Sequence, residues 1–158
     1  ASIGRPHFAR VLMRKYRFPT LQSVFDKLLK RNSPAYVPRE LPDPARAIDV
    51  IHAAGGVAVW AHPIYRERNE RAWARRIMKR FAPLGLDAIE AYYSMFGPEE
   101  TRMLTELAGT YGLALSGGSD YHGENSPNLS IGTGHGGLRV PAELLSELRR
   151  RRPVVSTP

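Results

Sequence analysis

Apolar side chains recur every three or four positions over the first forty residues, which predicts helices in this part of the chain. The first run is carried by Phe8, Val11 and Leu12. A second run spans residues 21–29, and we expect Thr20 to cap it, because a threonine hydroxyl can accept a backbone N–H from the first turn of a helix. The stretch from Asn32 to Pro44 contains four prolines, Pro44 included, and predicts an extended connection.

From Asp43 onward the pattern alternates between helices and short apolar strands. Asp43 and Pro44 are expected to begin a helix, as N-cap and first helical residue, and Gly97-Pro98 to begin another. Apolar strands are expected at residues 57–61, 86–92 and 113–116. The alternation predicts an α/β fold with about three parallel β/α units, in which ligands bind at the carboxyl ends of the strands. Because three parallel strands make a thin sheet, we expect further strands to precede this chain.

The composition limits the chemistry that the chain can carry. It contains no cysteine, so a metal ion would have to be held by imidazole and carboxylate groups. The net charge of +8 favours polyanionic partners such as nucleotides or RNA, although arginines on solvated helix faces explain it equally well. No apolar run is long enough to span a bilayer, and no signal peptide is evident, so we expect a cytoplasmic protein.

Metal-competent side chains follow two of the predicted strands. His62 ends the strand Trp60-Ala61 and is followed by Pro63, which places the imidazole at the mouth of the sheet. Asp120 and His122 follow the third strand, and residues two apart on an extended chain project to the same side. The alternatives are a hydrogen-bonded structural histidine at 62, and an Asx-type turn in which Asp120 caps its own loop.

Four segments together carry a family resemblance, in order and over nearly the whole chain. They are Ile3-Gly4-Arg5-Pro6-His7-Phe8-Ala9, Ala61-His62-Pro63, Ile89-Glu90-Ala91-Tyr92-Tyr93-Ser94 and Gly118-Ser119-Asp120-Tyr121-His122. The pattern resembles the polymerase-and-histidinol-phosphatase (PHP) family, and more narrowly its branch of nucleotide phosphatases and 5′–3′ exoribonucleases.

The resemblance implies the C-terminal portion of a distorted (βα)7 barrel that hydrolyses phosphate esters with up to three divalent ions, usually manganese, iron, zinc or magnesium. It identifies His62, Asp120 and His122 as metal ligands and catalytic residues. Arg5 and His7 match the substrate-binding position of a helical insertion. Residues 1–42 would then be the insertion and residues 43–158 the β/α part of the barrel. Glu90 matches no ligand position of the family.

The family's opening His-x-His motif and early ligands have no counterpart in this chain, so we expect a fragment with weak or no activity by itself. The expected substrate is a nucleoside 3′,5′-bisphosphate or short RNA. Two alternatives remain open, a histidinol-phosphate phosphatase and a non-catalytic anion- or RNA-binding module.

Several further residues were weighed for a role in binding. Lys27, Lys30 and Arg31 could extend an anion-binding surface, although an ordinary solvated helix face explains them better. Tyr36 and Arg39 are further possible contacts, whereas His52 and His135 are not expected to take part. Exposed sheet edges could also pair two chains into a homodimer.

Overall fold

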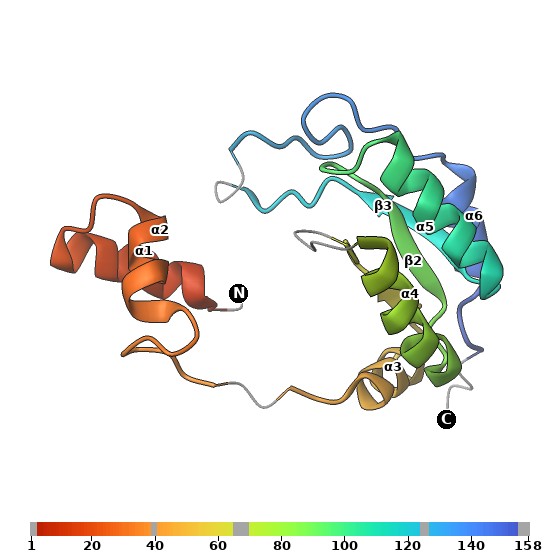
Figure 1. Cartoon of the computed structure of the whole chain (residues 1–158), viewed down its shortest axis with the longest axis horizontal. Helices are drawn as coiled ribbons and strands as arrows, with labels where there is room; N and C mark the ends of the chain where they lie inside the picture. Colours follow the sequence, from red (N-terminus) through yellow and green to blue (C-terminus); the bar gives the residue numbers. More distant parts are fainter. Residues whose placement is uncertain (1–2, 39–40, 65–69, 124–126, 155–158) are drawn as a thin grey trace. The chain divides into compact units, whose positions relative to one another are not determined.

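The chain divides into two units, residues 1–41 and 42–158, each with its own apolar core. The structure is a computed structural model that describes residues 3–38, 41–64, 70–123 and 127–154. Figure 1 shows helices alone in the first unit, from red to orange, and a sheet with flanking helices in the second.

The first unit is built from α1 (Arg5–Tyr16), the short α2 (Leu21–Val24) and η1 (Phe25–Leu29). The predicted cap is confirmed, since Ser23 N–H donates to Thr20 Oγ1 at 3.1 Å.

The second predicted helix is not uniform, because η1 is a π-helix. Lys30 N–H donates to Phe25 O at 2.8 Å, five residues back, and the wider turn lets Val24 and Leu29 share one buried face. Both of these side chains pack in one cluster with Ala9.

The segment after η1 differs from the extended connection that its prolines predict. Ala35 N–H donates to Leu28 O and Tyr36 N–H donates to Ser33 O, both at 3.0 Å, so the chain turns back on itself. Asn32, with φ +66°, supplies the left-handed residue of this turn, a conformation that asparagine tolerates better than most residues.

The second unit contains a three-stranded parallel sheet in the order β1 (Val59–Trp60), β2 (Ala88–Tyr93), β3 (Ala114–Gly118). The parallel α/β prediction is therefore confirmed. The edge strand β1 is shorter than predicted, at two residues.

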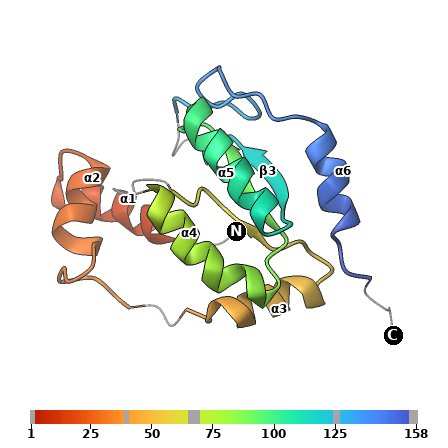
Figure 2. The same ribbon diagram turned by 45° about the vertical axis from the view of Figure 1, so that its right-hand side comes forward.

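Helices connect and cover the strands as the alternating pattern predicts. They are α3 (Pro44–Ala53), α4 (Glu70–Phe81) with the short η2 (Ala82–Leu84), α5 (Pro98–Thr110) and α6 (Glu143–Arg150). Figure 2 shows β3 between α5 and α6. Asp43 caps α3 by accepting Arg46 N–H at 3.1 Å, and Pro98 lies in the first turn of α5. The core contains Ile64, Met78, Ile89 and Leu104, all fully buried.

The amino end of the sheet is held by a structural carboxylate. Asp87 Oδ2 accepts Ala58 N–H at 2.7 Å and lies 2.7 Å from His52 Nε2. His52 therefore ties α3 to the start of β2. Two arginines of the basic tail are also engaged there, since Arg151 donates to Gly112 O and Arg152 to Gly55 O. Part of the positive charge thus closes loops of this fold.

Among the helices described, none has the length and apolar character that crossing a membrane requires.

Candidate active site

Two strand ends carry predicted site residues in a strained backbone conformation. His62 follows β1 with φ +30°, and Asp120 follows β3 with φ +56°. Positive φ is unfavourable for residues other than glycine, and His62 also precedes Pro63, which further restricts its backbone. Such strain persists only where surrounding contacts impose it, and it concentrates at functional sites.

Tyr93 links these two strand ends. Its hydroxyl donates to Asp120 Oδ2 at 3.0 Å, and its ring centroid lies 5.6 Å from that of His62. The tyrosine is 5% exposed, so the residue that joins the two strand ends is itself buried. His62 and Asp120, 58 positions apart in sequence, are therefore brought to one place, as the strand-end pattern predicts.

Glu90 reaches the same place from the middle of β2. One carboxylate oxygen, Oε2, accepts His62 N–H at 2.7 Å. Burial raises the pKa of the Glu90 carboxyl above its usual range, and the negative charge of Asp120 adds to the rise. The bond from His62 N–H and the charge of His62 act in the opposite direction and lower this pKa, but burial is the largest effect.

A β-bulge explains how Glu90 and Tyr93 act on the same side of the sheet. Glu90 pairs with Ser116 and Tyr92 with the next residue, Gly117, so Ala91 is an extra residue in β2. Residues three apart normally face opposite sides of a strand, but one extra residue reverses the alternation. Glu90 and Tyr93 can then both contact His62.

His122 lies beside Asp120 with its ring held by the backbone. His122 Nδ1 is 2.7 Å from Asp120 O and 3.5 Å from Asp120 Oδ1. A carbonyl oxygen can only accept, so Nδ1 carries a proton and the neutral ring has its lone pair on Nε2. A metal-ligating histidine usually donates its other ring N–H to a carboxylate, a backbone carbonyl or water, and Asp120 O is such a partner.

These residues fit a divalent ion by donor chemistry. Imidazole and carboxylate suit manganese, iron and zinc. Within the described part of the chain, however, no three His, Cys, Asp or Glu side chains converge tightly enough to hold one ion. The structure brings Asp120 together with His122 and, through Tyr93, with His62.

Arg5 and His7 belong to the first unit and are described within it. Both are exposed in the first turn of α1 and line a groove of about 1030 Å³. His7 Nδ1 lies 3.0 Å from Gly4 N and 3.3 Å from Gly4 O. In the neutral tautomer that accepts Gly4 N–H, the proton is on Nε2, which is then available as a donor. The other lining side chains are mainly apolar: Ile3, Phe8, Val11, Leu12, Leu29, Ala35, Tyr36, Val37 and Leu41.

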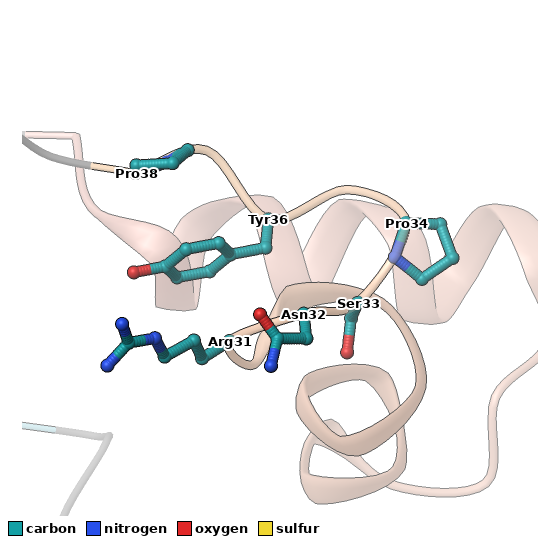
Figure 3. A pocket seen from close by; sticks show the side chains of 6 residues that line it. All are labelled: Arg31, Asn32, Ser33, Pro34, Tyr36 and Pro38. Carbon is teal, nitrogen blue, oxygen red and sulfur yellow. The ribbon is translucent and has the colours of Figure 1, made fainter.

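A second pocket, of about 730 Å³, lies on the turn after η1. Figure 3 shows the Arg31 guanidinium and the Tyr36 hydroxyl extending to the same side of it. Arg31 and Tyr36, two of the further contacts considered from the sequence, are therefore neighbours. Arg39 lies outside the described residues.

Sequence reasoning missed the parts played by Glu90 and Tyr93. A signal was present, since Glu90 is the one charged residue in the strand AIEAYY. A carboxylate in a buried strand is costly unless it has a partner, and it therefore indicates a specific interaction.

No protein-family model matches the chain. Among curated proteins, it is 38% identical over 131 residues to the 5′–3′ exoribonuclease Rnm of Salmonella typhimurium. The aligned region covers 83% of this chain and 44% of that protein. It is 31% identical over 130 residues to the 3′,5′-nucleoside bisphosphate phosphatase of Chromobacterium violaceum, covering 82% of this chain and 45% of that protein. The chain thus spans less than half the length of these relatives.

Two solved structures are also similar to this chain, in fold and in sequence. A structure assigned as a metal-dependent phosphoesterase from Bifidobacterium adolescentis superposes with a TM-score of 0.74 at 29% identity, over 95% of this chain and 51% of that one. An amidohydrolase from Chromobacterium violaceum, solved with bound sulfate, gives a TM-score of 0.70 at 30% identity, over 96% of this chain and 53% of that one. By sequence and by fold, the chain is a homologue of the exoribonucleases and nucleoside bisphosphate phosphatases of the PHP family.

Proposed function

We propose that this chain supplies part of a metal-dependent phosphoesterase site that acts on nucleoside 3′,5′-bisphosphates or on short RNA. The observation that carries the proposal is the meeting of His62 and Asp120 around Tyr93 at the carboxyl ends of β1, β2 and β3. The proposal concerns the ligands that this chain contributes, because the chain spans 44% of its exoribonuclease relative.

In this proposal, His62, Asp120 and His122 hold divalent ions, with manganese as the first candidate. Bound ions would supply Lewis-acid chemistry, polarising the phosphate and activating water near neutral pH. The chain's own residues prepare the ligands: Asp120 O fixes the His122 ring, and Tyr93 O–H holds the Asp120 carboxylate.

The first unit supplies the substrate contacts in this proposal. Arg5 can donate two hydrogen bonds to a phosphate, and His7 Nε2–H can add a third. Phe8 and Tyr36 line the same groove, and aromatic rings are the usual stacking surface for a nucleobase. A cation with aromatic side chains in one groove suits a nucleotide better than a simple phosphate ester.

The test is phosphate release from adenosine 3′,5′-bisphosphate with Mn²⁺, measured on the protein at its natural length. We expect His62→Ala, Asp120→Ala and His122→Ala each to lower kcat/KM roughly a hundredfold or more, because metal ions contribute several kcal/mol to such reactions. His135→Ala is the matched control, since His135 is an exposed histidine of the same unit.

The substrate groove has its own test. Arg5→Ala should raise KM about tenfold with little change in kcat, as expected for the loss of a charged hydrogen bond to bound substrate. Arg14→Ala, at an exposed position of the same helix, should leave both parameters unchanged.

A non-catalytic anion- or RNA-binding module is the second candidate. It is favoured by the net charge of +8 and by the lack of a three-ligand cluster among the described residues. Tight RNA binding without release of phosphate at any manganese concentration would support it against the enzyme.

A further inference from the structure

We propose that Glu90 is a positioning residue that holds the backbone of His62 in its strained conformation and so aims the imidazole for metal binding. This inference rests on the proposed function, because it concerns how one proposed ligand is oriented. It assigns a role to a carboxylate that the family pattern leaves without one.

The backbone of His62 is held from both sides. On one side, Glu90 Oε2 accepts His62 N–H at 2.7 Å. On the other, Trp73 Nε1–H, from α4, donates to Pro63 O at 3.0 Å. A positive φ in front of a proline needs such external support, since local preferences favour an extended backbone.

The carboxylate of Glu90 also lies beside the third strand, at Gly118. A Cβ placed on Gly118 would lie 3.3 Å from Glu90 Oε1, closer than most real contacts of this kind. Glycine at this position therefore gives the carboxylate room between the ends of β1 and β3. One carboxylate oxygen therefore binds His62 N–H, and the other lies beside Gly118.

Reach is the property on which this role depends. The bond to His62 N–H needs an acceptor oxygen at the end of a side chain of glutamate length. Glutamine keeps that length and an acceptor oxygen but loses the charge, whereas aspartate keeps the charge and is shorter by about 1.5 Å. If Glu90 were a direct metal ligand, or acted through its charge, Glu90→Gln would weaken Mn²⁺ binding more than Glu90→Asp.

The experiment is a calorimetric titration of Mn²⁺ into the natural-length protein, made metal-free, for the wild type and for Glu90→Gln, Glu90→Asp and Glu90→Ala. We expect Glu90→Asp and Glu90→Ala to weaken Mn²⁺ affinity about 10- to 100-fold, the range typical for loss of a group that orients a metal ligand. Glu90→Gln should stay within about threefold of the wild type, because its amide oxygen can accept the same bond.

Glu100 provides the matched control. Its carboxylate also accepts a backbone N–H, from Gly97 at 2.8 Å, at the start of α5. Glu100→Gln and Glu100→Asp should leave Mn²⁺ affinity unchanged, and circular dichroism checks that all variants are folded.

Two results would overturn the inference. One is unchanged Mn²⁺ affinity in both Glu90→Asp and Glu90→Ala. The other is an affinity loss in Glu90→Gln as large as that in Glu90→Asp, which would assign the effect to charge. The variant His62→Ala tests the proposed function separately from the role of Glu90. If His62→Ala leaves Mn²⁺ affinity intact, the assignment of His62 as a metal ligand is wrong.

Discussion

Gly117 lies in β3, three residues before Asp120, at a point where no side chain fits. A Cβ built there would lie 2.5 Å from Tyr92 Cβ, 2.7 Å from Tyr92 O and 3.0 Å from Val140 Cγ1. Two of these atoms belong to the neighbouring strand at the bulge, and they can move only if the strands move. Gly117→Ala should therefore force β2 and β3 apart.

The cost follows from overpacking. One extra methyl group in a packed region typically destabilises a protein by about 1–3 kcal/mol, and contact with backbone atoms favours the upper part of that range. For a protein of this size, about 2–3 kcal/mol corresponds to a Tm decrease of roughly 4–12 °C. Urea unfolding and a thermal melt would measure both quantities.

Gly109 supplies a control, because the same substitution there should change the stability in the opposite direction. It lies in α5, and a Cβ added there meets no atom within 4 Å. Gly109→Ala should stabilise the protein by up to about 1 kcal/mol, because alanine favours the helix. If Gly117→Ala proved as stable as Gly109→Ala, the close packing of β2 against β3 would be wrong.

Further predictions concern the carboxylates that hold the fold. Asp87→Ala should lower the free energy of unfolding, measured with urea, by about 1–3 kcal/mol, because it leaves the buried Ala58 N–H without its acceptor. His52→Ala should lower it by less, and equal losses in the two variants would contradict this ranking. The pKa of Glu147 is lowered by its hydrogen bonds with Arg150 and Arg151, so its contribution to stability is present above the ordinary carboxyl range and is lost as pH falls. Glu147→Gln should then lower Tm slightly at pH 7 and by progressively less as the pH falls below the ordinary carboxyl range. An equal decrease at pH 7 and at strongly acidic pH would exclude the ion pairs as the cause.

The elements of the fold could largely be predicted because their signals are local. Asp43-Pro44 and Gly97-Pro98 begin helices in the structure, since a cap and a proline act on the turn that immediately follows. The π-helical turn at residues 25–29 could not be predicted, because it depends on which side chains meet the buried face of α1.

The candidate site could likewise be predicted only in part. A strand-end pattern was enough to predict that His62 and Asp120 meet at one end of the sheet, where both contact Tyr93. The bulge at Ala91 was not visible in the sequence, because it arises from the register between two strands. Without the bulge, an alternating strand places Glu90 and Tyr93 on opposite faces, so their joint contact with His62 could not be foreseen.

The central claim is that His62, Asp120 and His122 hold divalent metal. The most direct measurement is the Mn²⁺ content of the natural-length protein after equilibrium dialysis, for the wild type and for the triple variant His62→Ala, Asp120→Ala, His122→Ala. We expect bound Mn²⁺ in the wild type and a clear loss, of at least one ion per chain, in the folded triple variant. Equal Mn²⁺ content in the two proteins would contradict it.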